Sequence, residues 1–334
     1  MKKLLRVMLC LALCGAVLTG CSTGEGPSPS PSPSPEASDP AEAVYQIGLV
    51  QYQEHTSLNT LREAFMGRLE EWGCDETQVE IDYQNAGGDP AKAEEICQGF
   101  VEDEVDMIVA ISTPAAQAAI DAAKDSDVTV VYTGVASESA LKVSGGSVTG
   151  VVAPTSGSAL LDLARQGNGS LATVGLLYNP DEPGSQAEAD QLKTLCSDQG
   201  LEVIESPVTS QEGAAEAATK LCAQVDAVFT PADNTIAPVA DQVAAAIKEA
   251  GKPWYVGSDA MVQGGALASI SVASRDQGVK AADMVVKLIE GEALANVPVY
   301  TFTSFRTFVN QTTLAALEGT TFPEETLQGA FLYQ

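Results

Sequence analysis

From residue 44 to the C-terminus, short apolar runs alternate with longer amphipathic segments, and this alternation limits the possible folds more than any other feature. The runs YQIGLVQY (45–52) and DMIVAI (106–111) are typical of the apolar segments. The segments between such runs have the length and period of helices. Strands that alternate with helices at this spacing form βαβ units, in which helices cover both faces of a parallel sheet.

The pattern occurs twice along the chain. In the first half it predicts strands at 45–52, 79–83, 106–111, 128–132 and 147–153, with helices at 58–72, 90–103 and 114–124. In the second half it predicts helices at 157–166, 186–199, 211–223 and 235–249, with strands at 171–178, 201–205, 226–230, 254–258 and 267–272. We therefore expect an α/β fold of two similar lobes, each a doubly wound parallel sheet.

Two short motifs support these helix and strand assignments. Asp89-Pro90 and Thr113-Pro114 each place a capping side chain before a proline at the first helical position. The two halves also share a motif, because Thr113-Pro114-Ala115 and Thr230-Pro231-Ala232 follow equivalent strands.

The last part of the chain bears on how the lobes connect. A helix at 276–290 and strands at 297–300 and 305–309 come late enough to return to the first lobe. We expect lobe 1 to comprise 44–154 and 273–304, and lobe 2 to comprise 155–272 and 305–334. Crossovers near 154, 273 and 304 would form a hinge that lets the lobes close on a ligand.

The N-terminus has the layout of a secretory signal peptide over residues 1–20. Lys2, Lys3 and Arg6 precede the apolar run VMLCLALCGAVL, which is too short to span a membrane. The following LTGC resembles the bacterial lipobox, which implies a lipid-modified Cys21 as the first mature residue. An ordinary signal peptide with an incidental cysteine is the alternative. The expected location is the outer face of the cell membrane, with anchoring through acyl chains on Cys21.

Residues 21–43 form a lipid anchor and a Ser/Pro-rich linker. The sequence GPSPSPSPSP has no side chains that build a core. Proline favours an extended chain of about 3 Å per residue, so this segment is predicted to be a spacer between the anchor and the folded part.

The chain is strongly acidic. Removal of the three basic residues of the leader leaves 14 Lys and Arg against 45 Asp and Glu, a net charge of about −31. Such a surface repels nucleic acid and anionic lipid, so we expect no nucleic-acid partner. Acidity of this kind commonly serves solubility and does not by itself indicate a cationic ligand.

The sequence offers little for catalysis, metals or cofactors. Cys74, Cys97, Cys196 and Cys222 form no CxxC or Cys/His cluster, and we expect buried thiols because the helices of each pair lie on opposite faces of a sheet. His55 is the sole histidine, and neither a G-x-S-x-G nor a phosphate-binding loop motif is present. The predictions are therefore no enzyme activity, no metal and no cofactor.

Several blocks together resemble a known family. They include IGLVQYQEH, DYQNAGGDPAKAEEI, IVAISTPAAQAA, VGLLYNP, FTPADNTI and GSDAMVQGGALAS. In this order, over about 45–325, they are similar to bacterial ABC-transporter substrate-binding proteins of the group associated with tryptophan and other aromatic amino acids. The resemblance implies the type I periplasmic-binding-protein fold and, as partners, a permease and an ATPase subunit. Thr56-Ser57 departs from the Pro-Ala often found in relatives.

The residues that follow the predicted strands are the candidates for ligand binding. In open parallel sheets, ligands lie beyond the carboxyl ends of the strands. The candidates are Glu54, His55, Thr56, Ser57, Ser112, Thr113, Thr133, Tyr178, Asn179, Asp233, Asn234 and Asp259.

The side-chain chemistry of these candidates suggests which group of a ligand each could bind. Ser112 and Thr113, at a helix start, suit a ligand carboxylate or serve only as caps. Asp233 and Asp259 suit an ammonium group, again with capping as the alternative. Tyr52, Tyr178 and His55 would supply an aromatic wall or simply pack.

The function predicted from these features is a solute-binding lipoprotein that captures a small solute between two lobes and presents it to a permease. The resemblance favours an aromatic or apolar amino acid as the solute. A sensor that signals to a membrane receptor is an alternative with the same fold, and a surface enzyme is a third possibility.

Overall fold

The computed structural model describes residues 44–75 and 77–334, which belong to one compact unit. The predicted signal peptide (1–20), the predicted lipidation site Cys21 and the Ser/Pro-rich linker (21–43) lie outside the described residues. Within the described ranges, no helix is both long and apolar enough to cross a membrane.

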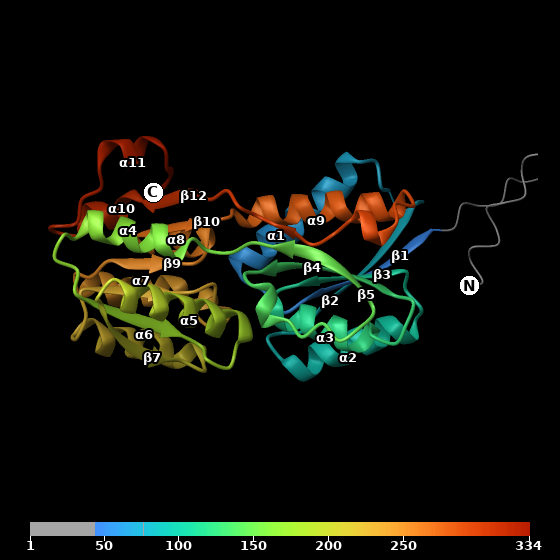
Figure 1. Cartoon of the computed structure of the whole chain (residues 1–334), viewed down its shortest axis with the longest axis horizontal. Coiled ribbons are helices and arrows are strands. Elements are labelled where there is room, and N and C mark those ends of the chain that lie inside the picture. Colours follow the sequence, from blue (N-terminus) through green and yellow to red (C-terminus); the bar gives the residue numbers. More distant parts are fainter. Residues whose placement is uncertain (1–43, 76) are drawn as a thin grey trace, which may run out of the picture. The chain divides into compact units, whose positions relative to one another are not determined.

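The first lobe is built on a six-stranded, wholly parallel sheet (Figure 1). The strand order is β11-β5-β4-β3-β1-β2. The strands are β1 (Tyr45–Gln51), β2 (Val79–Asn85), β3 (Met107–Ile111), β4 (Thr129–Val135), β5 (Ser147–Val152) and β11 (Tyr300–Thr301). All five residues of β3 are buried, as expected for a central strand that helices cover on both faces.

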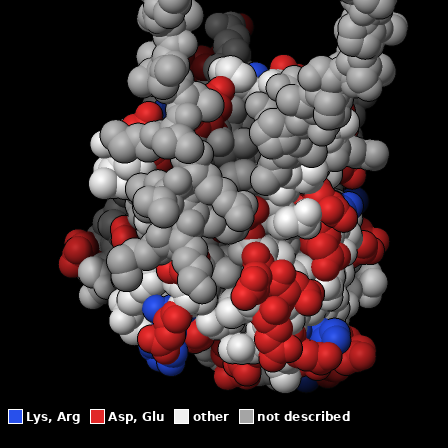
Figure 2. Space-filling model, turned by 90° about the vertical axis from the view of Figure 1, so that its right-hand side faces the viewer, with Lys and Arg blue, Asp and Glu red and all other residues white. Residues whose placement is uncertain are grey.

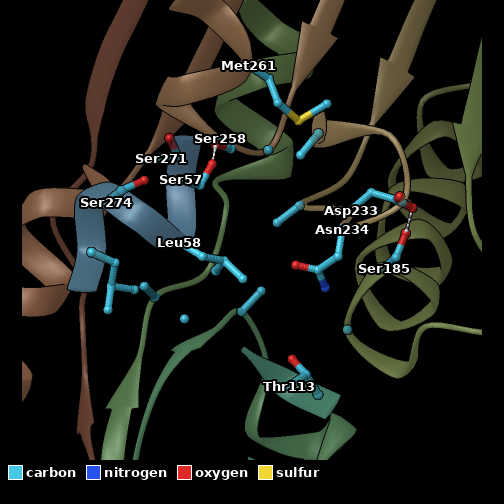
Figure 3. Close-up of a pocket in the computed structure, with 18 of the residues that line it drawn as sticks. Ser57, Leu58, Thr113, Ser185, Asp233, Asn234, Ser258, Met261, Ser271 and Ser274 are labelled. Atoms are coloured by element: carbon cyan, nitrogen blue, oxygen red, sulfur yellow. Dashed lines mark hydrogen bonds between the residues drawn. The ribbon is translucent and has the colours of Figure 1, made fainter. Parts of the chain in front are cut away.

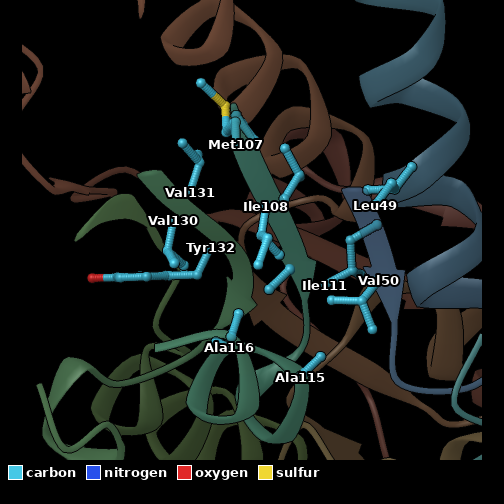
Figure 4. Packing of buried hydrophobic residues seen from close by; sticks show 14 of the residues in the cluster. Leu49, Val50, Met107, Ile108, Ile111, Ala115, Ala116, Val130, Val131 and Tyr132 are labelled. Carbon is cyan, nitrogen blue, oxygen red and sulfur yellow. The ribbon is translucent and has the colours of Figure 1, made fainter. Parts of the chain in front are cut away.

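Helices cover both faces of this first sheet. α1 (Thr56–Glu71) packs with α9 (Ser274–Ile289) on one face, and α2 (Pro90–Glu102) packs with α3 (Thr113–Ala123) on the other. A short 3-10 turn, η2 (Glu138–Ala140), follows β4. Figure 4 shows buried apolar side chains of β1, β3 and β4 on both faces of the sheet, with Ala115 and Ala116 of α3 on one of them.

The second lobe has a seven-stranded sheet in the order β13-β12-β10-β9-β8-β6-β7. The strands are β6 (Thr173–Tyr178), β7 (Glu202–Pro207), β8 (Ala227–Thr230), β9 (Trp254–Val256), β10 (Ala268–Ser271), β12 (Arg306–Asn310) and β13 (Phe331–Tyr333). All pairs are parallel except β10 with β12. β12 is antiparallel because β10 ends at the connection between the lobes and β12 begins there.

Helices also cover both faces of the second sheet. α4 (Gly157–Gly167) and α5 (Pro183–Asp198) share one core, and α6 (Gln211–Cys222) and α7 (Ala240–Glu249) share another. The remaining short elements are η3 (Ala237–Val239), α8 (Asp259–Gln263), η4 (Leu294–Asn296), α10 (Gln311–Ala316) and α11 (Glu324–Gln328). The predicted fold class, two parallel-sheet α/β lobes, is confirmed.

Three segments connect the lobes, and we call them the hinge: 153–156, 272–273 and 302–305. The chain leaves the first lobe after β5 and returns to it after β10. The return is shown by α9, which packs on α1, and by β11, which pairs with β5. It then enters the second sheet again as β12.

The predicted helix caps have mixed outcomes. Asp89 is the N-cap of α2, and its carboxylate accepts a hydrogen bond from the Ala91 N–H at 2.9 Å, as predicted. The prediction for Thr113 was wrong, because α3 begins at Thr113 itself and Ser112 is the N-cap, without a capping side-chain bond. Ser112 has a φ of 94°, a left-handed backbone that serine rarely adopts, and this geometry moves the helix start by one residue.

The four described cysteines are free thiols. Cys97, Cys196 and Cys222 are buried, and Cys74 is half-buried. The helices that carry Cys196 and Cys222 lie on opposite faces of the second sheet, which agrees with the expectation of thiols.

Candidate functional site

A cavity of about 750 Å³, partly open to solvent, lies between the lobes at the carboxyl ends of the strands. Residues of both lobes and of the hinge line it, and Figure 3 shows many of them pointing inward. The first lobe contributes the starts of α1 and α3, and the second lobe contributes the start of α5, the loop after β8 and α8. The hinge side is formed by the ends of β5 and β10 and the start of α9. This is the position at which open parallel sheets bind ligands.

Several hydrogen bonds join the lobes around this cavity. The hydroxyl oxygens of Ser57 and Ser258 are 2.7 Å apart, and His55 Nε2 lies 3.1 Å from Asn234 Oδ1. Gln53 Nε2 donates to the backbone carbonyl of Asn234. We call Gln53, His55 and Asn234 the interlobe bridge. In this structure the lobes are therefore closed on each other.

Local structure positions the first-lobe half of the bridge. Gln51, the last residue of β1, is fully buried, and its Nε2 donates 2.7 Å hydrogen bonds to the Gln53 carbonyl and to Asn59 Oδ1. These bonds tie the loop after β1 to the first turns of α1. His55 then occupies the N-cap position of α1 with extended backbone, so its side chain is held at the edge of the cavity.

A buried carboxylate positions the second-lobe half. Glu182, the N-cap residue of α5, accepts hydrogen bonds from the N–H and Nδ2 of Asn234 at 2.9 and 2.7 Å. Its other oxygen accepts from the N–H and hydroxyl of Thr235 at 2.9 and 2.7 Å. Because Nδ2 of Asn234 faces Glu182, the amide oxygen faces His55.

This amide orientation fixes the state of the imidazole. An amide oxygen only accepts, so His55 Nε2 carries the proton and donates to it. Burial lowers the pKa of His55 from its usual value, and the bond to Asn234 opposes that shift only in part. His55 is therefore neutral at pH 7, and its Nδ1 carries a lone pair. That atom is buried and has no hydrogen-bond partner in the described part of the chain.

Asp233 lies beside the bridge and is occupied by protein donors. Oδ2 accepts from the Asn179 N–H and the Ser185 hydroxyl, both at 2.6 Å, and Oδ1 accepts from the N–H groups of Thr235 and Ile236 at 3.0 and 2.9 Å. Burial, with the negative charge of Glu182 as a second cause, raises the pKa of Asp233 to about 7. In its ionised form Asp233 therefore adds negative charge beside the cavity, although both of its carboxylate oxygens already accept hydrogen bonds from the protein.

Asp259 lies on the other side of the cavity, at the start of α8. Its carboxylate accepts a 2.7 Å hydrogen bond from the Ser274 hydroxyl and a longer bond, 3.3 Å, from the Ser274 N–H. Burial raises the pKa of this carboxyl group. The contact ties α8 of the second lobe to the start of α9, which follows the hinge.

Two helix N-termini meet across the cavity. Thr113 begins α3 in the first lobe, and Gly184 lies in the first turn of α5 in the second. A β-carbon at Gly184 would lie 2.8 Å from Thr113 Oγ1, so these two helix starts are in contact range. Both ends present N–H groups without intrahelical partners and a positive dipole end, which suits an anion.

An outer cavity lies at the mouth of the cleft. It has a volume of about 1040 Å³, much of it open to solvent, and it shares Glu182 with the inner cavity. Tyr52, Gln53 and Asn179 are among its lining residues. The interlobe bridge therefore lies between the inner cavity and the mouth.

The structure brings six of the predicted site residues together around the inner cavity. These are His55, Ser57, Thr113, Asp233, Asn234 and Asp259. Asn179 lies at the mouth instead.

Five predicted residues do not line the cavity. Glu54 and Thr56 are exposed, and Ser112 and Thr133 are buried behind the lining residues, where Thr133 lies 3.5 Å from the Gln277 carbonyl. Tyr178 directs its hydroxyl to Glu205 at 2.6 Å. Tyr178 therefore forms no aromatic wall, and Tyr52, the other tyrosine proposed for it, lies at the mouth.

Sequence reasoning missed several lining residues. Glu182, Ser185 and Met261 come from the second lobe, and Ser271, Ser274 and Gln277 come from the hinge side. Glu182 could have been found, because it precedes Pro183 in the loop after a predicted strand. Ser271 and Gln277 lie inside a predicted strand and a predicted helix, and Ser274 lies between these elements, near the predicted crossover at 273.

Two α/β lobes that close through a three-segment hinge over one inner cavity define a two-lobe solute-binding protein. Among the residues that the structure describes, no group of three or more His, Cys, Asp or Glu side chains is placed to hold a metal. The chain belongs to the ABC transporter substrate-binding protein family, whose model matches residues 46–333. It is thus the solute-binding component of an ABC transporter.

Individual relatives are similar over most of their length. A tyrosine-binding protein of Clostridioides difficile is 30% identical over 324 residues, which is 95% of this chain and 92% of the relative. The crystal structure of an ABC domain in complex with L-Trp from Streptococcus pneumonia is 30% identical, has a TM-score of 0.81 and covers 87% of this chain and 100% of that chain.

A third relative differs in the arrangement of its lobes. The ligand-free, open structure of a substrate-binding protein with adhesive properties from Clostridium difficile is also 30% identical and covers 87% of this chain and 99% of that chain, with a TM-score of 0.64. Identity and coverage are nearly equal in the two structural comparisons, yet the L-Trp complex superposes better. This agrees with the hydrogen bonds that close the two lobes here.

Proposed function

We propose that this protein is an extracytoplasmic, lipid-anchored amino-acid-binding component of an ABC importer. It captures an amino acid with an aromatic or large apolar side chain in the inner cavity and delivers it to the permease. The observation that carries this proposal is the cavity itself, in which two helix N-termini and buried carboxylates lie next to an apolar lining. The printed ligands of the similar proteins, tyrosine and L-Trp, support it.

The ligand carboxylate would lie in the inner cavity beside the starts of α3 and α5, which both line it. A helix N-terminus attracts an anion through its unpaired N–H groups and its dipole, and here two such ends face each other across the cleft. Thr113 adds a hydroxyl donor at the same point. No Lys or Arg lines the inner cavity among the described residues, so the helix ends supply the positive potential.

The ligand side chain would lie against the apolar part of the lining. This part comprises Leu58, Leu61, Ala136, Ala153, Ala237, Met261 and Val272. Figure 3 shows Leu58 and Met261 on different sides of the cavity. An apolar lining with a few polar groups that converge on it is the usual composition of a small-molecule site.

Anchoring and delivery depend on parts beyond the binding domain. Acyl chains on Cys21 would hold the protein at the membrane, and the Ser/Pro-rich linker would let the domain reach the permease. Figure 2 shows that acidic side chains predominate on the visible face of the first lobe. We propose that exposed carboxylates of both lobes contact the membrane subunits.

A thermal-shift screen of the purified protein against amino acids, sugars and nucleosides tests the ligand class. A ligand at a hundred times its Kd should stabilise the protein by about 2.7 kcal/mol, an easily measured rise in Tm. We expect aromatic amino acids to give the largest shifts. If a sugar or nucleoside raises Tm and no amino acid does, the proposed ligand class is wrong.

The anchor and the transport role have separate tests. Cys21→Ser should abolish incorporation of radiolabelled palmitate and release the protein from the membrane fraction. Deletion of the gene should reduce uptake of the ligand found in the screen, and normal uptake in its absence would contradict the delivery role.

A further inference from the structure

We propose that Gly184 determines how tightly this protein holds its solute, because the lobes close fully only when residue 184 has no side chain. Gly184 lies in the first turn of α5 and faces Thr113 of the other lobe. The inference rests on the proposed function, since it concerns lobes that close on a bound solute, yet it holds whichever solute that is. Gly184 is thus a positioning residue, which acts through the approach of the two lobes.

A β-carbon at position 184 would meet the opposite lobe first. Its three nearest atoms would be Oγ1, Cβ and Cγ2 of Thr113, at 2.8, 3.5 and 3.9 Å. A distance below 3.0 Å is one that real β-carbons essentially never show, so one of the two groups would have to shift. Among the glycines of the described ranges, Gly184 is the only one whose nearest atoms all belong to the other lobe.

The backbone at Gly184 does not itself require glycine. The residue is the second of α5, and its φ is not among the positive values found at other glycines of the described chain. Alanine fits a helical backbone and has a higher helix propensity than glycine. Within the second lobe alone, alanine would therefore be tolerated, and the cost of a side chain arises from the space that Thr113 occupies.

Hydrogen bonds within the second lobe hold the start of α5 in place. Glu182 accepts hydrogen bonds from the N–H and Nδ2 of Asn234 at 2.9 and 2.7 Å. The Ser185 hydroxyl donates to Asp233 at 2.6 Å. Because these residues flank Gly184, the helix start cannot withdraw from the cleft without breaking buried hydrogen bonds.

The first lobe holds Thr113 in a similar way. Ser112 precedes it and donates its N–H to the Thr133 carbonyl at 2.9 Å, while the Ser112 carbonyl accepts from the Ala116 N–H at 2.9 Å. Thr113 is buried, with 5% of its surface exposed. Rotation about its Cα–Cβ bond would bring either the methyl group or a hydrogen to the place of Oγ1, and helices restrict this rotation for threonine. A side chain at 184 would therefore disfavour the closed form.

A change that disfavours the closed form weakens binding of any solute that the closed form holds. If closure becomes less favourable by a given factor, the Kd rises by up to the same factor. The rise should be similar for all solutes, because the contact between Gly184 and Thr113 is made by protein atoms alone.

A double-mutant cycle tests this role. Calorimetry measures the Kd of L-tryptophan, L-tyrosine and L-phenylalanine for the wild-type protein, Gly184→Ala, Thr113→Ala and the double variant. Thr113→Ala removes Oγ1 and leaves the β-carbon, which at 3.5 Å is in ordinary contact distance. Gly213→Ala is the matched control, since Gly213 lies in the first turn of α6 in the same lobe and its β-carbon would meet no atom within 4 Å.

We expect Gly184→Ala to raise the Kd of all three amino acids roughly five- to a hundredfold, the usual range for an overpacked contact. In the Thr113→Ala background the same change should raise Kd by less than about twofold, because the clash is gone. Gly213→Ala should leave Kd unchanged. The Tm of ligand-free Gly184→Ala should match that of the wild-type protein, since the open lobes accept the methyl group.

Several outcomes would overturn the inference and leave the proposed function standing. A wild-type Kd for Gly184→Ala would show that closure does not depend on this position. An equal loss with and without the Thr113 hydroxyl, together with a lower Tm, would place the effect within the second lobe. If the wild-type protein binds another solute of the screen and no amino acid, the proposed ligand class fails, and the same cycle with that solute decides the role of Gly184.

Discussion

Ser57, in the first turn of α1, and Ser258, the N-cap residue of α8, place their hydroxyl oxygens 2.7 Å apart and so join the two lobes. The bond lies at the inner cavity, on a different side from the Asn234 contact of the bridge (Figure 3). The closed form is thus held at more than one point around the ligand position.

Loss of this hydroxyl pair should weaken binding without unfolding the protein. Ser258→Ala removes a neutral hydrogen bond that exists only between closed lobes, so we expect Kd to rise about two- to tenfold. Ser139→Ala is a matched control, since the hydroxyls of Ser137 and Ser139 form a 2.8 Å pair within one lobe. Calorimetry with the best ligand measures both variants, and an unchanged Kd for Ser258→Ala would show that the serine bond does not support closure.

A second prediction concerns the close approach of α1 and α9. A β-carbon at Gly278 would lie 2.1 Å from the Leu61 carbonyl oxygen, a backbone atom that cannot move aside cheaply. Gly278→Ala should therefore force the helices apart and destabilise the protein by about 1–3 kcal/mol. Chemical denaturation measures the change in the free energy of unfolding.

The control for Gly278 lies on the partner helix. A β-carbon at Gly67, within α1, would meet no neighbouring atom of the described chain within 4 Å. Gly67→Ala should stabilise the protein by up to about 1 kcal/mol, because alanine favours helix over glycine. If Gly278→Ala and Gly67→Ala change the free energy of unfolding equally, α1 and α9 do not approach each other as closely as this structure shows.

Much of this fold could be predicted from the sequence, because apolar runs and helix periods report directly on which segments are buried. The run MIVAI became the fully buried β3, and Asp89-Pro90 became the start of α2. The exact start of α3 could not be predicted. It depends on the strained backbone of Ser112, which the surrounding tertiary structure imposes.

The site was predictable only in outline. Strand ends identified His55 and Asp233, because the carboxyl edge of a parallel sheet follows from chain direction. Which way each side chain turns depends on register and on its partners. Tyr178 ends a strand as predicted, yet it bonds Glu205. The position of Glu182, before Pro183 and after a predicted strand, marked it as a candidate, but its hydrogen bonds to Asn234, which is distant in sequence, could not be read from that position.

The titration of Asp233 gives a prediction that depends on pH. Its pKa is raised to about 7, so from about pH 4 to pH 7 the folded protein keeps a proton that the unfolded chain has lost. The contribution of Asp233 to stability is therefore present at low pH, decreases as pH rises, and is lost above pH 7. A bound ammonium group favours the ionised form, so amino-acid affinity should rise from pH 5 to pH 8.

Carbon-13 NMR of the aspartate carboxyl groups can measure this titration. We expect a midpoint near 7 for Asp233 in the ligand-free protein and a lower midpoint with ligand bound. Asp226 is an internal reference, because hydrogen bonds from the Thr173 and Ala172 N–H groups lower its pKa. A midpoint near 4 for Asp233 without ligand would mean that water reaches it and that the site is not desolvated.

Replacement of Glu182 should change three measurable properties at once: the stability of the protein, its affinity for the ligand and the pKa of Asp233. Glu182→Gln substitutes a donor for one of two oxygens that together accept bonds from Asn234 and Thr235, so we expect a loss of about 2–4 kcal/mol in stability and at least tenfold in affinity. The pKa of Asp233 should fall, because the charge of Glu182 helps to raise it. Glu205→Gln, at an exposed carboxylate of the same lobe, is the control and should leave affinity unchanged. An Asp233 midpoint that stays at its wild-type value in Glu182→Gln would assign the raised pKa to burial alone.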